Sequence, residues 1–435
     1  MEKIRKRRIS KTNVQAGVTA GRQYLTGLDI FGGMVTVPLF YMYPQGLDPK
    51  AMERSLAITL RRYPLVAGRL KKDAEGYPYI DADDSGVPFE VYDVDGPMPA
   101  YGPDYPHQSF IDQYYDKVFP WTIYRKDTPL FGVKVFRFAD GGAICTMAPV
   151  HCLIDGSSVW MFVQDWARAA RGEELAPVVE RDFLLERSQQ YSGHLYGRRE
   201  VMTLGRWQRL GLYARLAWQV IGNRLEVHRI PGRYLDRLRA DYEKACPDGP
   251  SVSDADLITA RCLKEIGRVQ GYRRDLHVGM VVDFRFKRGL DIPRRLFGLA
   301  IGQEERTFSA RDLQECSVPA LTMKLRQPED PPRTEDWRGY LGFMERQRQQ
   351  KTLGSVIPRS VVRGLEGGFM QNNYCAMPVY DADLGTGQPT WYTPTAAPFR
   401  MVKIVPTAGD DNTVDLHLIL SRRELRAFRT LFGRL

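Results

Sequence analysis

The feature that most constrains the fold is a strand hairpin that leads directly into an amphipathic helix. Between residues 130 and 138, β-prone side chains alternate with small or charged ones, and residues 143–148 run back after a glycine turn. Beyond Gly156, apolar residues recur at helical spacing as far as Gly172, a typical helix end. Residues 151–156 therefore form a loop between a strand and a helix, at the mouth of a sheet.

The rest of the chain carries both the alternation of apolar residues typical of strands and the spacing typical of helices. These patterns do not follow the regular strand–helix–strand order of a doubly wound sheet. We therefore predict an α/β fold of mixed sheets flanked by helices. A chain of 435 residues is expected to form two or three domains. The other predicted elements are a helix between Asp48 and Pro64, a helix after Ser253, strands at 277–283 and 413–420, and a last helix opened by a capping box at Ser421 and Glu424.

The composition indicates a soluble globular protein, with 43% hydrophobic and 26% charged residues. The net charge of +10 is spread along the chain except for a basic run, Lys3–Lys11, which we interpret as a solvated tail rather than a nucleic-acid-binding segment. No apolar stretch approaches the roughly 20 residues of a membrane-spanning helix. The six cysteines form no CxxC pair, which predicts free thiols in a reducing, cytoplasmic compartment, without a zinc site or disulfides. Neither a Rossmann nor a P-loop glycine motif is present.

Residues 173–250 contain several prolines around a helical stretch, Gly205–Leu225, in which tryptophans and leucines are interleaved with arginines. We interpret residues 186–250 as a crossover region between the two halves of the chain. The helix has two interpretations. The one we prefer packs it on the neighbouring domain with its arginines extended to solvent, and the alternative lays it on a membrane surface.

The strongest chemical signal is His151-Cys-Leu-Ile-Asp155-Gly156 on the strand-to-helix loop. An imidazole has a near-neutral intrinsic pKa and can act as a general base at physiological pH. Asp155 is spaced to point away from the reacting face and to hold the loop, and Gly156 is expected to permit a tight turn. Cys152 is an alternative nucleophile, but adjacent side chains rarely point the same way, so we interpret it as a packing residue. An HxxxDG motif on its own is weak evidence.

Three other segments occur in order around this loop, and together they strengthen the interpretation of the HxxxDG motif. They are Tyr63-Pro-Leu-Val-Ala-Gly-Arg-Leu70, Val282-Asp-Phe-Arg285 and Asp383-Leu-Gly-Thr-Gly387. In this order, and over nearly the whole chain, the sequence resembles the BAHD family of coenzyme A-dependent acyltransferases. Two further segments add to the resemblance, Thr26-Gly-Leu-Asp29 and Leu296-Phe-Gly-Leu-Ala-Ile-Gly302.

The segment at 383–387 departs from the family's DFGWG motif, because its phenylalanine and tryptophan are lost while Asp383, Gly385 and Gly387 remain. This divergence suggests a bacterial or fungal outlier of the family. Since the motif lies far from the reacting atoms in the family, we expect these three residues to be structural.

The resemblance implies two chloramphenicol acetyltransferase-like domains, at residues 1–185 and 251–435, with a channel between them and His151 at its centre. It also implies an enzyme that transfers an acyl group from acyl-CoA to a hydroxyl or amine of a small, specialised-metabolite acceptor. In that reaction His151 takes the acceptor's proton, acyl-CoA is a co-substrate, and no bound cofactor or metal is needed. We expect a monomer without a nucleic-acid partner.

Two alternatives belong to other functional classes. A condensation-type enzyme with a carrier-protein donor shares the fold and the motif, but it favours a second histidine directly before the first, where this chain has Val150. A non-catalytic binding or membrane-surface protein would have no use for His151, Asp155 and Gly156, so their presence argues against it.

In the family that the chain resembles, an arginine after such a strand segment pairs with the motif aspartate. We therefore expect Arg285 to pair with Asp155, with Arg288 as the alternative partner. Asp283 is expected to hold the strand end through backbone hydrogen bonds. An Asp155 carboxylate that faces His151 without an arginine contact would instead indicate a triad.

Overall fold

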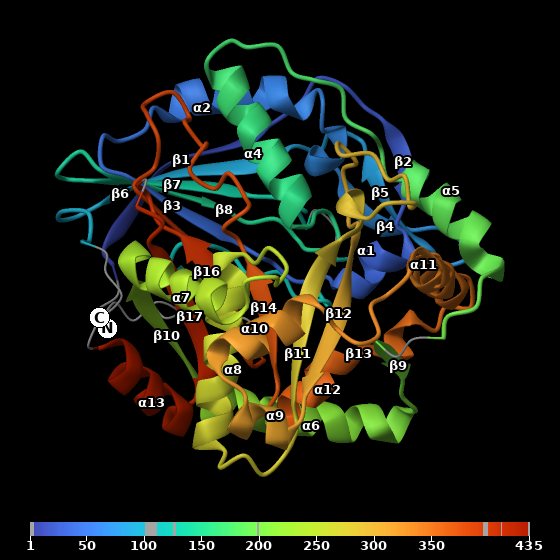
Figure 1. The fold of residues 1–435 in the computed structure, drawn as a ribbon. Helices are drawn as coiled ribbons and strands as arrows, with labels where there is room; N and C mark the ends of the chain where they lie inside the picture. Colours follow the sequence, from blue (N-terminus) through green and yellow to red (C-terminus); the bar gives the residue numbers. More distant parts are fainter. Residues whose placement is uncertain are drawn as a thin grey trace.

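The computed structural model describes residues 4–100, 111–124, 128–197, 200–394, 399–409 and 411–433. Its framework is a pair of six-stranded mixed sheets, one in each half of the molecule, with helices packed on them (Figure 1). This arrangement confirms the predicted α/β class of mixed sheets flanked by helices.

The first sheet is built mainly from the N-terminal part of the chain. Its strand order is β1 (Lys6–Val14), β6 (Val87–Val94), β7 (Val133–Phe138), β8 (Ala143–Met147), β3 (Leu39–Tyr43) and β15 (Trp391–Pro394). The β7–β8 pair is the predicted hairpin, and its strands are antiparallel. The last strand, β15, comes from far along the chain and pairs antiparallel with β3, so the C-terminal half completes this sheet.

The second sheet is built from the C-terminal half. Its strand order is β10 (Asn223–Ile230), β17 (Val414–Ser421), β16 (Met401–Pro406), β14 (Phe369–Asn373), β11 (Leu276–Asp283) and β12 (Ile301–Phe308). Strand β14 runs parallel to both of its neighbours, while the other pairs are antiparallel. The predicted strands at 277–283 and 413–420 are therefore interior strands of this sheet, each next to an edge strand.

The remaining elements flank the two sheets or connect them. The short strands are β2 (Gly21–Tyr24), β5 (Pro78–Ala82), β4 (Arg69–Lys72), β9 (Val201–Thr203) and β13 (Val356–Pro358). The helices are α1 (Gly27–Gly32), α2 (Pro49–Leu60), α4 (Gly156–Ala170), α5 (Asp182–Gln190), α6 (Arg206–Gly222), α7 (Gly232–Ala245), α8 (Asp254–Val269), α9 (Ala310–Glu315), α10 (Val318–Arg326), α11 (Thr334–Gln349), α12 (Arg359–Leu365) and α13 (Arg422–Phe432). Among these described helices, none is long and apolar enough to cross a membrane.

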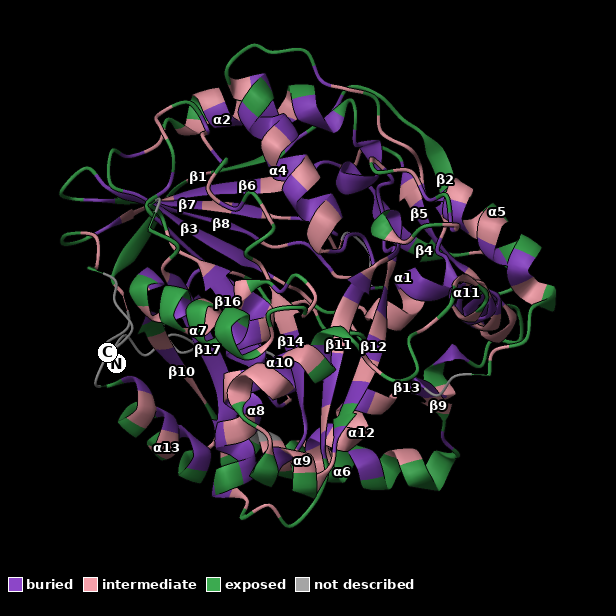
Figure 2. Ribbon diagram, viewed as in Figure 1, coloured by how far each residue is buried: buried purple, intermediate pink, exposed green. Residues whose placement is uncertain are grey.

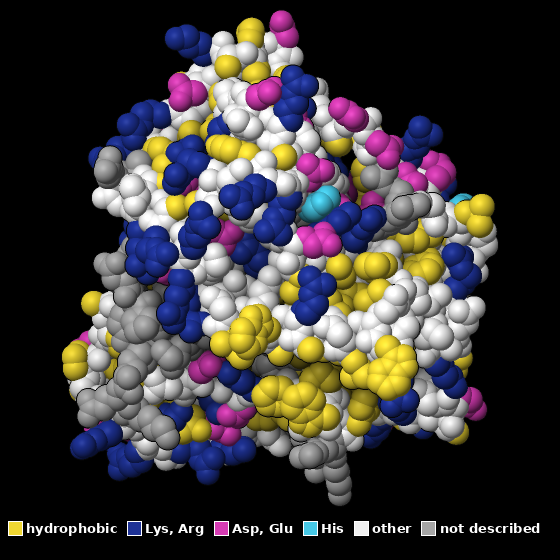
Figure 3. Space-filling view, turned by 90° about the horizontal axis from the view of Figure 1, so that it is seen from below, with side chains coloured by type: hydrophobic (Ala, Val, Ile, Leu, Met, Phe, Trp, Pro, Cys, Tyr) yellow, Lys and Arg dark blue, Asp and Glu magenta, His cyan; other side chains and the backbone are white. Residues whose placement is uncertain are grey.

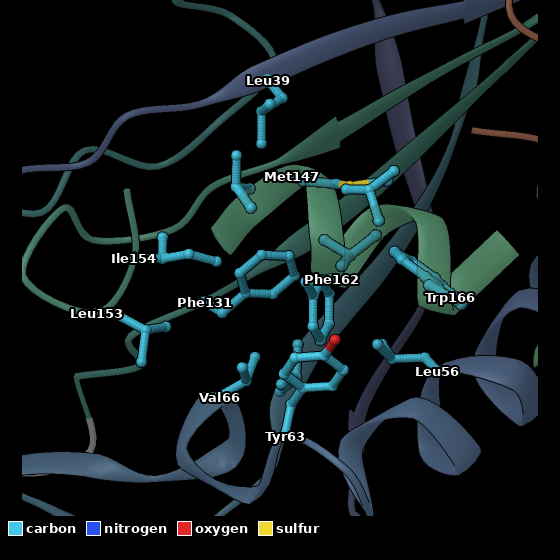
Figure 4. Close-up of a cluster of buried hydrophobic side chains, with 14 of the residues drawn as sticks. Leu39, Leu56, Tyr63, Val66, Phe131, Met147, Leu153, Ile154, Phe162 and Trp166 are labelled. Atoms are coloured by element: carbon cyan, nitrogen blue, oxygen red, sulfur yellow. The ribbon is translucent and has the colours of Figure 1, made fainter. Parts of the chain in front are cut away.

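The core of the first half forms where α2 and α4 lie on the sheet. Figure 4 shows Phe162 and Trp166 of α4 directed toward Leu56 of α2 and toward Tyr63. The Phe162 ring lies 5.2 Å from that of Tyr63 and 5.1 Å from that of Phe131, both edge to face. Such aromatic pairs add to the stabilisation from buried apolar area. The packing fixes α4, and with it the loop that precedes the helix.

The basic run at the N-terminus is not the solvated tail that we predicted. Residues 6–14 form edge strand β1, which pairs antiparallel with β6. Most of its side chains are exposed, and two of them make ion pairs with the neighbouring strand, Lys11 with Glu90 and Arg7 with Asp93. Charged side chains are common on edge strands because they oppose pairing with another chain.

The last helix begins at the predicted capping box. The Ser421 side chain accepts a hydrogen bond from the Glu424 backbone N–H. In turn, the Glu424 carboxylate accepts from the backbone N–H and the hydroxyl of Ser421. Glu424 also accepts two hydrogen bonds from the Arg400 guanidinium, at 2.6 and 2.7 Å. Burial by itself would raise the pKa of Glu424, but the Arg400 charge and these hydrogen bonds outweigh it and lower the pKa to about 2.

This pair predicts part of the acid sensitivity of the fold. A fall in the Glu424 pKa from 4.5 to about 2 corresponds to about 3 kcal/mol of stability, present above pH 4.5 and lost as the pH falls toward 2. Glu424→Gln should therefore be less stable at pH 7 and lose less stability on acidification, as measured by denaturant unfolding from pH 7 to pH 3. Glu173→Gln, at an exposed ion pair, is the control. Equal losses on acidification in wild type and Glu424→Gln would contradict the assignment.

Candidate active site

His151 lies on the loop between β8 and α4, where the sequence places it. Its backbone N–H donates to the Val35 carbonyl (2.8 Å), which ties the loop to the segment after α1. A Cβ atom at Gly32 would lie 2.1 Å from Leu299 Cδ2 and 3.4 Å from His151 Nδ1. The end of α1 and the segment around Leu299 therefore pack together beside the imidazole, and Gly32 has no room for a side chain.

Burial sets the protonation state of the imidazole. It lowers the pKa of His151 from 6.5, an effect that the residue's own backbone carbonyl and the Asp155 carboxylate partly oppose. Nδ1 is buried and makes no hydrogen bond of ordinary geometry within the described part of the chain. The ring is therefore mainly neutral at pH 7, the form in which an imidazole can accept a proton.

Asp155 is fully buried and holds the loop rather than the imidazole. Its Oδ1 accepts from the backbone N–H of Ser158 (2.9 Å), which makes it the N-cap of α4. Its Oδ2 accepts from the backbone N–H of Ala300 (2.8 Å) and from Arg285 Nη1 (2.9 Å). No hydrogen bond joins Asp155 to His151 in the described residues. This geometry matches the expected ion pair with Arg285 and differs from a triad.

Arg285 is buried at the end of β11, and each of its guanidinium nitrogens donates a hydrogen bond. Besides Asp155, it donates to Asp283 Oδ1 (3.0 Å) and to the carbonyls of Leu296 (3.0 Å) and Gly298 (2.9 Å). Asp283 Oδ1 also accepts from the Arg285 backbone N–H, as expected for a residue that holds the strand end. Because a buried charge is costly without partners, this full set of acceptors lets the arginine sit inside the protein.

The segment Leu296–Ala300, part of the sequence similar to a family motif, is thereby bound to the histidine loop. Ser158 donates to the Gly298 carbonyl (2.8 Å) and accepts from its N–H (3.2 Å). Gly298 has φ +147°, and a Cβ there would lie 3.4 Å from Arg181 Cβ. The close approach and the positive φ together explain a glycine at this position.

A second buried ion pair, which the sequence analysis missed, supports the same loop. Arg181 Nη1 lies 3.1 Å from Asp29 Oδ2, and neither side chain is exposed. Arg181 also donates to the carbonyls of Cys152 (3.3 Å) and Leu153 (2.9 Å), the two residues after His151. Asp29 Oδ1 accepts from the Leu299 N–H (3.1 Å). The Thr26–Asp29 segment was a signal for Asp29, but nothing in the sequence singled out Arg181.

Of the two other loop residues for which we predicted a role, Gly156 differs from the prediction and Cys152 agrees with it. Gly156 does not adopt positive φ, so the tight turn expected of it is absent; it is the first residue of α4. A Cβ there would lie 3.1 Å from Met377 Cε, so the methionine side chain would have to shift slightly to admit one. Cys152 is buried, and burial raises the pKa of its thiol to about 12. A thiol with that pKa is a poor nucleophile, in agreement with a packing residue.

The remaining motif residues lie in structural settings. The Tyr63 hydroxyl donates to Asp165 Oδ2 (2.5 Å), and Arg295 from the second half donates to the same oxygen (2.5 Å). Asp383 Oδ1 accepts from the N–H groups of Gly385 (2.9 Å) and Gly387 (2.8 Å), so this segment is a self-contained turn.

Both glycines of that turn have positive φ, 104° for Gly385 and 107° for Gly387. The turn is held to the first half by Thr386, whose hydroxyl donates to the Gly46 carbonyl (2.8 Å). No described contact joins it to His151. Within the described residues, no group of three or more His, Cys, Asp or Glu side chains could hold a metal ion.

The Asp155–Arg285 pair predicts a stability effect. Arg285→Ala should lower the free energy of unfolding by roughly 3–5 kcal/mol, because it leaves the Asp155 carboxylate buried without its cation. Chemical denaturation measures the change. Arg288→Ala, three residues on at an exposed position, should change the stability by less than about 0.5 kcal/mol. Equal stability of the two variants would show that the buried pair does not hold the fold.

Comparisons with known proteins agree with the motifs. A family model described as "Transferase family" matches residues 11–200. A hydroxycinnamoyl-CoA:5-hydroxyanthranilate N-hydroxycinnamoyltransferase of Avena sativa is 24% identical, with 89% of this chain and 86% of the relative covered. The shikimate O-hydroxycinnamoyltransferase of Nicotiana tabacum is 22% identical, with 94% of each covered.

Solved structures share the fold over nearly the whole chain. Vinorine synthase superposes with a TM-score of 0.70 at 17% identity and covers 99% of this chain and 98% of its own. F. graminearum TRI101 in complex with coenzyme A and deoxynivalenol has a TM-score of 0.71 at 15% identity, with 94% and 97% covered. The first condensation domain of the calcium-dependent antibiotic synthetase has a TM-score of 0.59 at 16% identity, with 96% of each chain covered. These findings confirm the resemblance of this chain to the BAHD family of transferases, which the motifs carried.

Proposed function

We propose that this protein transfers an acyl group from acyl-CoA to a hydroxyl or amine of a small-molecule acceptor, with His151 as the general base. The observation that carries the proposal is the state of His151. Its ring is kept mainly neutral by burial, on a loop whose backbone is held by Arg181 and whose end is held by Asp155 and Arg285. A fixed, neutral imidazole is what proton abstraction from an acceptor requires.

In the proposed reaction His151 takes the proton of the acceptor O–H or N–H while the acceptor atom attacks the thioester carbonyl. The tetrahedral intermediate collapses by breaking the carbon–sulfur bond, and the imidazolium returns its proton to the CoA thiolate. Holding both substrates at one site can contribute about 7–11 kcal/mol to lowering the barrier. Asp155 and Arg285 are positioning residues in this scheme, since they act on the loop and not on the reacting atoms.

The choice of donor is supported by two kinds of observation. The Avena sativa relative is named for a hydroxycinnamoyl-CoA donor, and TRI101 was solved with coenzyme A. A chain with a net charge of +10 also favours a ligand that carries several phosphates. The relatives are named for acyl transfer to nitrogen and to oxygen, so the acceptor is proposed as an amine or a hydroxyl.

The general-base role predicts the effect of removing the imidazole. His151→Ala should lower kcat by about 10²–10⁴, the usual contribution of acid–base catalysis, without changing the unfolding midpoint. Release of free thiol from a panel of acyl-CoAs with alcohol and amine acceptors measures turnover. His277→Ala is the matched control, because burial also lowers the pKa of His277, but its ring lies on β11 and contacts Thr307. A folded His151→Ala variant with near wild-type turnover would rule out the mechanism.

The pH profile gives a second readout of the same role. Because burial lowers the pKa of His151, turnover should rise with pH to a plateau, with a midpoint below 6.5. The residual activity of His151→Ala should lack this rise. A midpoint unchanged in the variant would assign the titration to another group.

The donor class can be tested separately from the base. Purified protein should transfer the acyl group of acyl-CoA and bind free CoA in calorimetry, with weaker binding at higher salt because the contacts are to phosphates. The same acyl group presented on a carrier protein is the comparison. Activity with the carrier-bound acyl group alone would favour the condensation-type alternative and refute a CoA donor.

A further inference from the structure

Helix α6 lies on the outside of the second half, at the bottom of Figure 1. Its inner side is anchored by Leu212 and Leu216, which pack in a small apolar cluster with residues of β9, β13 and α12. Arg209 donates to the Gly354 carbonyl (2.7 Å) and Gln219 to the Gly364 carbonyl (2.8 Å). These contacts fix which side of the helix turns inward.

The opposite side of α6 exposes large apolar side chains. Trp207 and Trp218 are each 79% exposed, and Ile221 is 66% exposed. Leu210 and Tyr213 are about half exposed on the same helix. Figure 2 shows exposed residues along the outer side of α6, and Figure 3 shows large hydrophobic side chains gathered on this face of the molecule. From the sequence we preferred a helix packed on the neighbouring domain. In the structure, only the narrow side of α6 with Leu212 and Leu216 packs in this way.

The charges on this helix are all positive. Helix α6 contains no aspartate or glutamate, and a further arginine, Arg224, follows two residues after its end. Within the described residues, no ion pair involves Arg206, Arg209, Arg215 or Arg224. Arg224 instead donates to the carbonyls of Ile221 and Asn223, which places its cation at the end of the apolar face. The exposed apolar face is therefore bordered by Arg206, Arg215 and Arg224, which have no acidic partner among the described residues.

Helix α13 shows that this arrangement is not a general property of the basic helices here. It also carries several arginines, but its large apolar residues Leu425, Phe428 and Phe432 are buried against the second sheet. A helix with a buried apolar face and a basic outer face is ordinary in a globular protein. On α6 the two tryptophans are turned outward together with Arg206 and Arg215.

We propose that α6 lies in the headgroup region of an anionic lipid bilayer, with Trp207, Leu210, Trp218 and Ile221 inserted and the arginines against lipid phosphates. Tryptophan and arginine are typical of helices that lie in this zone, and indole rings favour it. The two tryptophans lie roughly 16 Å apart along the axis, so the helix would meet the surface along its length.

The charge argues for a bilayer over other occupants. A second copy of this chain docked through the same face would bring unpaired arginines of both copies together, which is repulsive. A nucleic acid would engage the arginines but would leave the leucine and isoleucine side chains without an apolar environment. An anionic bilayer offers phosphates to the arginines and an apolar environment to the leucine, isoleucine and tryptophan side chains. The proposal concerns a surface separate from the His151 loop and does not depend on the proposed acyl transfer.

The test is co-sedimentation of the full chain with vesicles of phosphatidylcholine alone and of phosphatidylcholine with phosphatidylserine. Binding should require the anionic lipid and weaken with salt. Trp207→Gln/Trp218→Gln should abolish it, whereas Trp121→Gln, which removes a 71% exposed tryptophan elsewhere, should not. Because these side chains are exposed, both variants should keep the wild-type unfolding midpoint.

The charge is tested with a matched pair of triple variants. Arg206→Gln/Arg215→Gln/Arg224→Gln should weaken vesicle binding by roughly 100-fold, at about fivefold for each charge near the surface. The control removes the same charge from the exposed face of α13, as Arg422→Gln/Arg423→Gln/Arg426→Gln, and should retain most of the binding.

Three outcomes would overturn the proposal. The first is no binding to anionic vesicles, and the second is equal loss in the α6 and α13 variants, which would indicate attraction by net charge alone. The third is a dimer in sedimentation equilibrium that the Trp207→Gln/Trp218→Gln variant dissociates, without vesicle binding, which would assign the face to a second copy.

Discussion

The buried ion pair between Asp155 and Arg285 is the interaction on which the candidate site depends. The two residues come from different halves of the chain, and their side chains are almost completely removed from solvent. The arginine also collects the carbonyls of Leu296 and Gly298, so one guanidinium joins the start of α4, the end of β11 and the segment that follows. Since each charge would be costly without the other, the two halves are held in one relative position at the site.

The pair of Asp29 with Arg181 completes this support from the other side. Arg181 holds the carbonyls directly after His151, and Asp29 holds the Leu299 amide, so two independent ion pairs bind the same two segments together. His151 itself makes no hydrogen bond to either carboxylate in the described residues. Its orientation follows from a rigid backbone, and its neutral state follows from burial. The motif aspartate therefore supports the backbone of the loop and not the imidazole.

Much of the local structure could be predicted because its signals lie within a few neighbouring residues. The hairpin before His151, the helix that begins at Gly156 and the capping box at Ser421 depend on periodicity and caps, and all three are present. The pairing of Asp155 with Arg285 was also expected, but through a family resemblance. The predicted tight turn at Gly156 was wrong, because this residue does not adopt a positive φ; the close neighbour of a Cβ at this position would instead be Met377, more than 200 positions away.

By itself, the sequence determined several of the helices and strands, the mixed-sheet class and the loop that carries His151, since these depend on side-chain periodicity and on motifs read in order. Only the tertiary structure decided that Lys6–Val14 is an edge strand, that β15 completes the first sheet and that Arg181 lies under the histidine loop. It also decided that the aromatic side of α6 faces outward. The physical reason is that periodicity reveals an apolar side of a helix or strand, whereas the surface available to cover that side is assembled from residues far away in the chain.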